Sequence, residues 1–234
     1  MQIKDSVVLV TGANRGIGAE FVRQLAERGA AKIYATARSA DSIDAEGVEV
    51  IALDVTDPAQ IEAAAALAGD VQLVINNAGA SSGLTALGGD LAGIRSEFDV
   101  NVFGPLALAR AFAPALARNG GGAVLNVLSA LSWISAPGAS VYAATKAAAW
   151  SLTDGIRIEL SEQGTQVLGM HMGMVDTDMT AGYEIAKISP ATAVTAALDG
   201  IEAGLSEVLV DDTAKYVKST LGLDPVARYA VPVG

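Results

Sequence analysis

A tyrosine, a lysine and a serine in this chain have the types and spacing of a proton-transfer site. Tyr142 and Lys146 stand four residues apart, and Ser129 lies thirteen residues before the tyrosine. Residues four apart on a helix share one face, one turn from each other. A neighbouring ammonium favours the phenolate and so lowers a tyrosine pKa from its free value of about 10. The same spacing also fits a tyrosine packed on a helix beside a solvated lysine, so the elements around it must distinguish the two.

A glycine-rich loop lies between the first predicted strand, Ser6–Val10, and the first predicted helix, Ala19–Arg28. Glycines there let the backbone approach a pyrophosphate, and the helix N-terminus offers free N–H groups and a positive dipole end. The order strand, glycine loop, helix therefore predicts a nucleotide-binding site. The residues expected to line the cofactor in this loop are Gly12, Asn14, Arg15, Gly16, Ile17 and Gly18.

The end of the second predicted strand indicates which cofactor is bound. An acidic residue at this place binds the ribose 2′-hydroxyl of NAD, whereas a basic one suits the 2′-phosphate of NADP. The strand ends in Arg38 and carries no carboxylate. Arg38 and Arg15 could hold the phosphate from two sides. The sequence thus predicts NADP(H) in preference to NAD(H), with two solvated arginines as the alternative.

The rest of the chain alternates apolar runs with Ala- and Leu-rich stretches. This alternation predicts a parallel sheet with helices on both faces, and Asp57 is expected to cap the helix that starts at Pro58. Further strands are expected at Lys32–Ala37, Val48–Leu53, Val71–Ile75, Ala123–Leu128, Gln166–Met170 and Glu207–Val210. Further helices are expected at Pro58–Leu67, Leu91–Ala117 (one helix or two abutting ones), Ala143–Glu162 and Ala191–Ala203.

Composition excludes several classes of function. The 234 residues are 51% hydrophobic, enough for one sizeable domain. A net charge of −11 argues against nucleic acid and anionic membranes, which need a positive field. There is no cysteine and a single histidine, His171, so neither a disulfide nor a metal site is expected.

No membrane segment is expected either. The N-terminal residues lack the apolar stretch of a signal peptide. The uncharged run Asn119–Thr145 has the length of a membrane span, but Asn126, Pro137 and Gly138 fit a strand, a loop and a helix start better. The prediction is a soluble, cytoplasmic protein.

Taken together, the motifs resemble the short-chain dehydrogenase/reductase family in its shorter, single-domain form. The resemblance runs from about Ser6 to Thr180, with the motifs in the order that the family has. They are Thr11–Gly18, Asp54, Asn76–Gly79, Asn101, Ser129, and Tyr142 with Lys146. It implies a Rossmann-type, doubly wound α/β/α fold in one domain over residues 1–234, with a small substrate-binding segment near 174–190.

The resemblance also implies a role for each catalytic residue. Ser129 would orient a substrate carbonyl, and Tyr142 would act as general acid in reduction and general base in oxidation. Lys146 would lower the tyrosine pKa and hold the nicotinamide ribose. Asn101 would support a water that relays protons to the lysine. Tyr142 and Lys146 would thereby also contact the cofactor.

Further cofactor contacts are implied along the chain. They are Asp54 and Val55 at the adenine, Asn77, Ala78 and Gly79 in the groove, and Gly173, Val175 and Thr177 beside the nicotinamide, where Thr177 would meet the carboxamide. The stretch after the sixth strand departs from the family, because Met172 stands where a proline is common. Proline would fix φ at this turn, so the loop is expected to be more mobile here.

The leading interpretation is an NADPH-dependent reductase of ketones or aldehydes. An NAD-linked alcohol dehydrogenase and a non-catalytic NADP-binding sensor or scaffold are the alternatives. His171 either packs in the core or contacts substrate. An apolar substrate is suggested by candidate pocket residues that could equally be packing: Trp133, Ile134, Met174, Met179 and Tyr183.

A homodimer or homotetramer is expected, since family members usually assemble through the two long helices around the fifth strand. Those helices are Ala-rich here, over Leu106–Ala117 and Ala143–Leu160. Small side chains would let two such helices approach closely, and they could equally pack within one chain. The tail 222–234 is irregular in sequence and is a second candidate for contact with a partner subunit.

Overall fold

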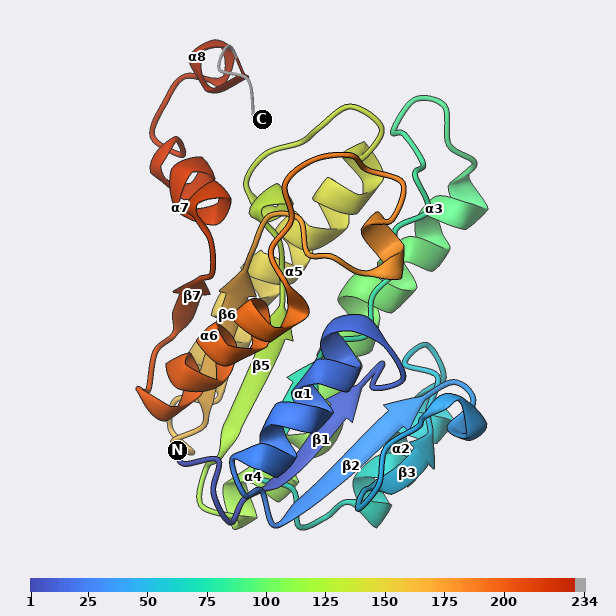
Figure 1. Cartoon of the computed structure of the whole chain (residues 1–234), viewed down its shortest axis with the longest axis vertical. Helices are drawn as coiled ribbons and strands as arrows, with labels where there is room; N and C mark the ends of the chain where they lie inside the picture. The colour runs from blue at the N-terminus through green and yellow to red at the C-terminus, as the bar shows by residue number, and fades with distance from the viewer. Residues whose placement is uncertain (230–234) are drawn as a thin grey trace.

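The sheet has seven parallel strands in the order β3-β2-β1-β4-β5-β6-β7, as the computed structural model of residues 1–229 shows (Figure 1). The chain order reverses between β1 and β4, which places a crevice at their carboxyl ends. The strands are β1 (Val7–Thr11), β2 (Lys32–Ala37), β3 (Glu49–Ala52), β4 (Leu73–Asn76), β5 (Ala123–Val127), β6 (Gln166–His171) and β7 (Glu207–Leu209). The predicted doubly wound α/β fold is confirmed.

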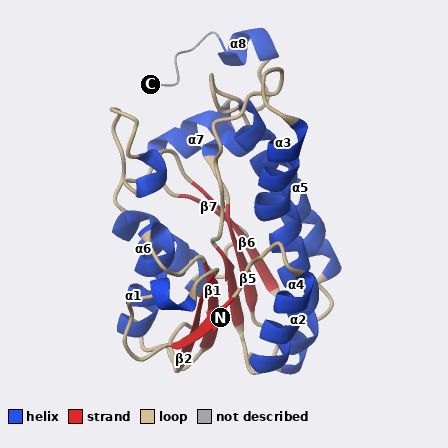
Figure 2. Cartoon of the chain, turned by 90° about the vertical axis from the view of Figure 1, so that its right-hand side faces the viewer, coloured by secondary structure: helices blue, strands red, loops and turns tan. Residues whose placement is uncertain are grey.

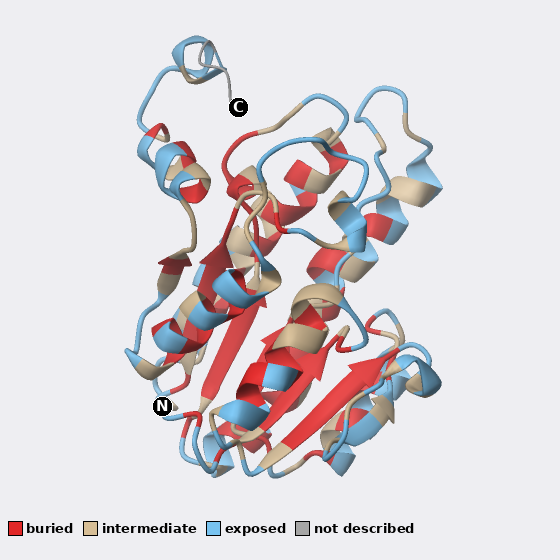
Figure 3. Cartoon of the chain, in the orientation of Figure 1, coloured by how far each residue is buried: buried red, intermediate tan, exposed pale blue. Residues whose placement is uncertain are grey.

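The inner strands are apolar on both faces because helices cover both. Every residue of β4 is buried, whereas β3, at one edge of the sheet, is mostly exposed (Figure 3). Parallel pairing sets the register, with Val8 opposite Leu73 and Leu73 opposite Ala123. The glycine loop after β1 and the polar turn after β4 therefore emerge side by side.

The helices form the two outer layers (Figure 2). On one face α1 (Gly16–Glu27) and α6 (Pro190–Glu202) pack against each other and the sheet, burying Phe21 and Leu198. On the other face lie α2 (Pro58–Leu67), α4 (Gly104–Arg118) and α5 (Ser140–Glu159). Asp57 caps α2 as predicted, since its side chain accepts hydrogen bonds from the Ala59 and Gln60 amides.

The predicted helix over 91–117 is interrupted by a π-helical turn. It consists of α3 (Leu91–Phe98), the π turn Asp99–Phe103, and α4. By length and mean hydropathy the stretch Leu91–Arg118 could cross a membrane, and no other helix within residues 1–229 meets that description. In the fold, α4 packs against α2, α5 and the strands β4 and β5.

Two elements at the C-terminal end were missed by the sequence analysis. They are α7 (Asp212–Ser219) and the short α8 (Pro225–Tyr229), which extend beyond the edge strand β7 (Figure 1). The Tyr229 hydroxyl accepts a hydrogen bond of 2.9 Å from the Ser135 amide. The irregular tail is thus partly helical, and its last residues, 230–234, lie outside the described part.

Candidate active site

The carboxyl ends of the strands bring the predicted site residues to one edge of the sheet. The glycine loop follows β1, Asn77–Gly79 follow β4, Ser129 follows β5, and the segment with Gly173 and Thr177 follows β6. Parallel strands end at the same edge, so segments far apart in the sequence meet there. Helix α5 then returns from this edge with Tyr142 and Lys146 in its first two turns.

Tyr142 and Lys146 lie on one face of α5, as their spacing predicted. The Lys146 ammonium is 5.6 Å from the centre of the Tyr142 ring and donates a hydrogen bond of 2.8 Å to the Val127 carbonyl. That carbonyl ends β5, two residues before Ser129. The lysine thus joins the helix to the strand that carries the serine.

Burial shifts the pKa of both groups toward their neutral forms. It raises the pKa of Tyr142 to about 12, with a further rise from the Glu97 carboxylate and an opposing hydrogen bond from Ser129. It lowers the pKa of Lys146 to about 8, against the effect of Glu97. The pKa of Tyr142 was predicted to be lowered by the lysine. This prediction is wrong for the surroundings that the protein itself provides, because the cost of removing the phenolate from water outweighs every effect that lowers the Tyr142 pKa.

Ser129 is fixed by a local turn. It caps the short 3-10 helix Ala130–Ser132, where its hydroxyl oxygen accepts a hydrogen bond of 3.1 Å from the Leu131 amide. The Ser129 amide in turn donates to the Ser132 hydroxyl at 3.4 Å. Since the oxygen accepts from the backbone, its own proton is left to donate toward Tyr142 or a substrate oxygen.

Asn101 lies in the π turn and connects three segments. Its Oδ1 accepts from the Ala80 amide at 2.9 Å, and its Nδ2 donates to the Ala80 carbonyl at 2.8 Å and to the Thr145 hydroxyl at 3.0 Å. Thr145 stands between Tyr142 and Lys146 and donates to the Tyr142 carbonyl at 2.7 Å. Asn101 thereby holds the loop after β4 against α5. Its support of a relay water stays a prediction.

The glycine loop has the backbone that a phosphate cradle requires. Gly12 and Gly16 adopt positive φ of 63° and 54°, which disfavour any side chain. A Cβ on Gly18 would lie 1.9 Å from the Gly12 carbonyl oxygen. Asn77 closes the loop, because its Nδ2 donates to the carbonyls of Thr11 and Gly12 at 2.9 and 3.1 Å. Asn14 lies in the same turn, and Ile17 is the second residue of α1.

The groove continues from the glycine loop to the catalytic residues. A Cβ on Gly12 would lie 3.1 Å from the Ala78 Cα. One on Gly79 would lie 3.4 Å from the Asn101 Oδ1 and 3.9 Å from the Lys146 Nζ. A bound molecule that followed Gly12, Ala78 and Gly79 would therefore reach the lysine.

The two predicted phosphate-binding arginines have different neighbours. Arg38 follows β2, and its charge contributes to lowering the pKa of Asp54, after the stronger hydrogen bonds from Thr56. Arg15 stands at the N-cap position of α1 without a capping side-chain hydrogen bond, and it forms an exposed ion pair of 3.0 Å with Asp178. Asp54 and Val55 follow β3. A Cβ added to Gly104 would lie 2.9 Å from the Val55 carbonyl oxygen.

The segment after β6 packs over the glycine loop. A Cβ on Gly16 would lie 3.1 Å from the Thr177 Cγ2, and Gly173 donates to the Asp211 carboxylate at 2.9 Å. Val175 is buried and forms a bridge to Ile188. Met172 is buried too, and its carbonyl accepts from the Ala130 amide at 2.8 Å. Packing anchors this position, where the resemblance implied a proline, and the mobility of the loop stays a prediction.

The apolar candidates divide into core and surface. Trp133 and Ile134 are buried, whereas Met179 and Tyr183 are exposed on the segment after β6, with Met174 half-buried. His171 is fully buried and does not face solvent. Within residues 1–229, no cluster of three His, Asp or Glu side chains could hold a metal ion.

One charged residue of the site was missed. Glu97 on α3 is 3% exposed, and its Oε2 accepts from the Ser82 amide at 3.0 Å and from the Ser82 hydroxyl. It acts on the pKa of both Tyr142 and Lys146. The sequence signal was its place four residues before Asn101, but a glutamate on a helix usually faces water.

Comparisons with known proteins agree with this arrangement. Residues 6–187 match the family model described as short chain dehydrogenase. An uncharacterized oxidoreductase of Staphylococcus aureus (strain USA300) is 31% identical over 191 residues, covering 77% of this chain and 83% of the relative. The chain belongs to the short-chain dehydrogenase/reductase family and is an oxidoreductase of that family.

Solved structures resemble the whole chain. A short chain dehydrogenase from Burkholderia cenocepacia J2315, in complex with NADP, is 39% identical with a TM-score of 0.94, covering 99% of this chain and 100% of that one. A short-chain dehydrogenase from Sphingobium yanoikuyae in complex with NADPH is 27% identical with a TM-score of 0.77, covering 96% and 91%. Both share the fold described above.

Proposed function

We propose that this protein is an NADPH-dependent carbonyl reductase that converts a ketone or aldehyde to an alcohol, reversibly. The observation that carries the proposal is the meeting of three groups at one edge of the sheet. The Ser129 hydroxyl is close enough to the Tyr142 phenol to lower its pKa, and the Lys146 ammonium lies 5.6 Å from the centre of the tyrosine ring. A half-buried phenol near a hydroxyl and an ammonium suits the transfer of a proton to or from one substrate oxygen.

The glycine loop fits a dinucleotide. Gly12 and Gly16 offer backbone where a side chain would be strained, and α1 begins there with free N–H groups. Arg38 and Asp54 would hold the adenosine end, and Lys146 and Thr177 the nicotinamide end. The nicotinamide would supply hydride for reduction and accept it in oxidation.

The protein's own groups move the proton. A pKa of about 12 keeps Tyr142 protonated at neutral pH, which is the form that can donate to a carbonyl oxygen as it gains charge. Ser129 would hold the same oxygen by donating its hydroxyl proton. Oxidation of an alcohol needs the tyrosinate, so we expect it to gain rate as the pH rises.

Removing the phenolic hydroxyl tests the assignment. Tyr142→Phe keeps the ring and should bind NADPH with unchanged Kd in a fluorescence titration. Carbonyl reduction should fall roughly 10²–10⁴-fold, the usual contribution of acid–base catalysis. The exposed Tyr216 gives a matched control, Tyr216→Phe, which should reduce the same panel of ketones and aldehydes at the wild-type rate. Full activity in Tyr142→Phe would refute the mechanism.

The preference for NADPH rests on Arg38, on the absence of a carboxylate at the end of β2, and on the NADP complex of the B. cenocepacia relative. The pairing of Arg15 with Asp178 favours the NAD-linked alternative, since a cation already paired offers less to a phosphate. Comparing kcat/KM for NADPH and NADH decides between them. Turnover by neither cofactor, despite tight NADPH binding, would revive the sensor or scaffold.

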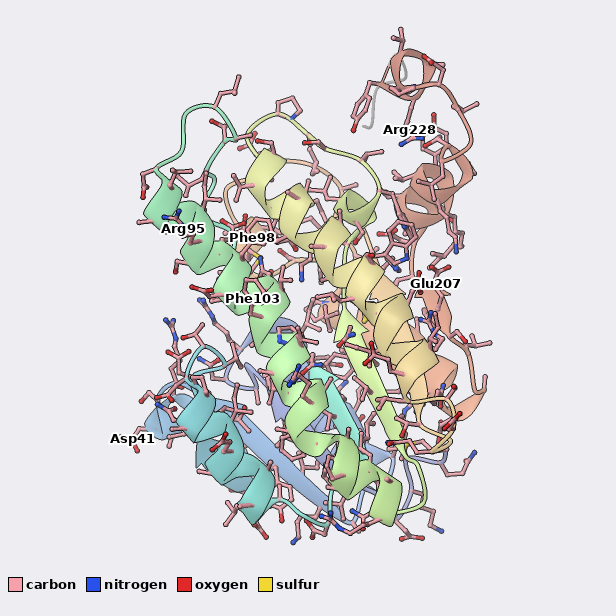
Figure 4. All side chains as sticks on the ribbon, turned by 180° about the vertical axis from the view of Figure 1, so that it is seen from behind. Asp41, Arg95, Phe98, Phe103, Glu207 and Arg228 are labelled. Atoms are coloured by element: carbon pink, nitrogen blue, oxygen red, sulfur yellow. The ribbon has the colours of Figure 1, made fainter. Side chains whose placement is uncertain are left out.

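The substrate and the assembly are also proposals. Exposed Met179 and Tyr183 support an apolar carbonyl compound, to be tested by chain-length series of ketones. A homodimer or homotetramer is supported by exposed apolar side chains on the outer helices, Phe103 at 55% (Figure 4) and Ile158 at 74% exposure. Light scattering of the purified protein measures this mass. A cytoplasmic location is proposed with them and is tested by cell fractionation.

A further inference from the structure

The single histidine of the chain contacts the backbone of the predicted catalytic serine. His171 ends β6 and is fully buried. Its Nδ1 lies 3.1 Å from the Ser129 carbonyl oxygen. A carbonyl can only accept, so this nitrogen must carry the proton, which leaves Nε2 with its lone pair. The contact therefore defines the tautomer of the ring.

The ring of His171 is held in place by Trp133. The two rings are stacked with their centres 4.0 Å apart and their planes 16° from parallel. Trp133 belongs to the turn that Ser129 caps, and its ring also meets Trp150 of α5 in an edge-on arrangement, with the ring centres 6.0 Å apart. The stack fixes the plane in which Nδ1 points at the serine carbonyl.

A charged pair completes the surroundings of the imidazole. Nε2 is 3.7 Å from a Glu207 carboxylate oxygen, and the other oxygen of Glu207 pairs with Lys218 of α7. Nε2 has no hydrogen-bond partner among the described residues. Burial, more than the charges of Lys218 and Lys146, lowers the pKa of His171 to about 4, so the ring is neutral at physiological pH. The positive charge of Lys218 compensates the negative charge of the Glu207 carboxylate, which faces the Nε2 lone pair.

Few groups hold the Ser129 carbonyl. It accepts from the Ser132 amide at 3.0 Å within its own turn, and from His171, which comes from another strand. The other side of the same peptide unit is held by the residue that follows β6, because the Ala130 amide donates to the Met172 carbonyl. We propose that His171 is a positioning residue of the active site, whose Nδ1–H holds the Ser129 carbonyl and thereby fixes the direction of the Ser129 hydroxyl. This inference rests on the proposed role of Ser129.

Two substitutions separate positioning from packing. His171→Phe keeps a ring on Trp133 and removes the donor, whereas His171→Asn loses the ring but places an amide N–H near the former Nδ1. Positioning predicts that kcat for carbonyl reduction falls at least about tenfold in His171→Phe, because a displacement of about 1 Å can cost far more than that. The Kd for NADPH should not change, and His171→Asn should recover most of kcat. A Phe variant more active than the Asn variant would show that packing alone matters.

A second measurement needs no activity and no variant. Because the chain has one histidine, 15N labelling of histidine gives one unambiguous imidazole spectrum. At pH 7 it should show a hydrogen-bonded proton on Nδ1 and an unprotonated Nε2. Protonation on Nε2 alone would overturn the proposal even if the protein reduced no carbonyl. Loss of the proposed function would instead appear as an inactive wild type with the expected histidine spectrum.

Discussion

Tyr142 is kept protonated by burial and by a carboxylate that the sequence did not mark as part of the site. Glu97 sits on α3, 3% exposed, and its charge raises the pKa of Tyr142 and of Lys146. A raised tyrosine pKa suits an acid that must hold its proton until a carbonyl oxygen needs it. Its effect on Lys146 opposes the burial that lowers the lysine pKa to about 8, and so favours the charged ammonium. One buried charge thus serves both partners in the direction of reduction.

Replacing Glu97 by glutamine should shift the pH profile. Glu97→Gln keeps an acceptor for Ser82 and removes the negative charge, so the pKa of Tyr142 should fall. The rising limb of the pH profile of alcohol oxidation should then move to lower pH. Each unit of this movement raises the rate below the limb about tenfold, since the tyrosinate fraction changes by that factor. Steady-state oxidation rates from pH 6 to pH 10 measure it.

Glu162 provides the matched control for Glu97. It is an exposed glutamate after α5, and Glu162→Gln should leave the limb in place. An unmoved limb in Glu97→Gln would mean that the carboxylate is too well screened to act on Tyr142. A loss of rate at all pH values would mean that Glu97 has a structural role.

At the scale of residues, local spacing predicted what local geometry can place. The Tyr142–Lys146 pair needed only one helical turn, and it lies as expected. Glu97 could not be found in this way, because its burial depends on the loop that brings Ser82 over α3. The pKa of Tyr142 was misjudged for the same reason, since desolvation is set by the whole fold.

Among the elements, the π turn Asp99–Phe103 brings Asn101 to the catalytic helix. A π turn holds an extra residue and is often found at functional sites. Here it turns the Asn101 amide toward Ala80 and Thr145, which lie on different segments. The loop after β4, the helix pair α3–α4 and the catalytic helix α5 therefore share one polar contact beside Tyr142.

Removing the Thr145 hydroxyl should affect both stability and catalysis. Thr145→Val leaves an Asn101 donor without its partner in a buried place, which typically costs about 1–3 kcal/mol. It also frees the loop that carries Ala80, so kcat for reduction should fall by several-fold. Urea unfolding and steady-state kinetics on the same preparation measure the two effects.

Thr153 is the control, two turns further along the same helix. Its hydroxyl is equally buried, donates to the Ala149 carbonyl at 2.7 Å and accepts from Asn126 at 2.9 Å. Thr153→Val should therefore lose a similar free energy of unfolding but keep kcat. Equal losses of kcat in both variants would show that general loosening of α5, and not the Asn101 contact, slows the reaction.

Element boundaries were predictable where turn chemistry marks them. Strand β2 and helix α2 lie at the expected residues, and Asp57 with Pro58 explains the start of α2. Helix α5 begins at Ser140, earlier than expected, so that Tyr142 falls in its first turn. Helix α7 was missed because its apolar face covers the turn around Trp133, a contact invisible from local sequence.

At the scale of the whole molecule, the site exists because the parallel strands β1, β4, β5 and β6 end at one edge of the sheet and bring the loops that follow them together. The close approach of Gly16 to Thr177 joins the glycine loop to the segment after β6, and the approach of Gly18 to the Gly12 carbonyl closes the loop on the start of α1. The parallel sheet was predictable from the alternation of elements. The contact of α7 with this framework, through Lys218, Glu207 and His171, required the structure.

Acid should destabilise the molecule through His171. Its folded pKa of about 4 lies below the value of about 6.5 expected in the unfolded chain. Between these values the unfolded state binds the extra proton, so stability is fully present above about pH 6.5 and falls as the pH drops toward 4. At pH 5 this amounts to about 2 kcal/mol relative to pH 7. Urea unfolding at a series of pH values measures the slope.

The His171→Asn variant isolates this contribution from that of the acidic groups. Carboxylates such as Asp54 and Glu20, whose pKa values are lowered by hydrogen bonds, also lose stabilising interactions in acid, and the variant keeps them. The difference between wild type and variant should therefore shrink by about 2 kcal/mol from pH 7 to pH 5. A constant difference would mean that His171 titrates in the fold as it does in the unfolded chain. The burial of the imidazole between β6 and Trp133 would then be too loose to hold Ser129 in place.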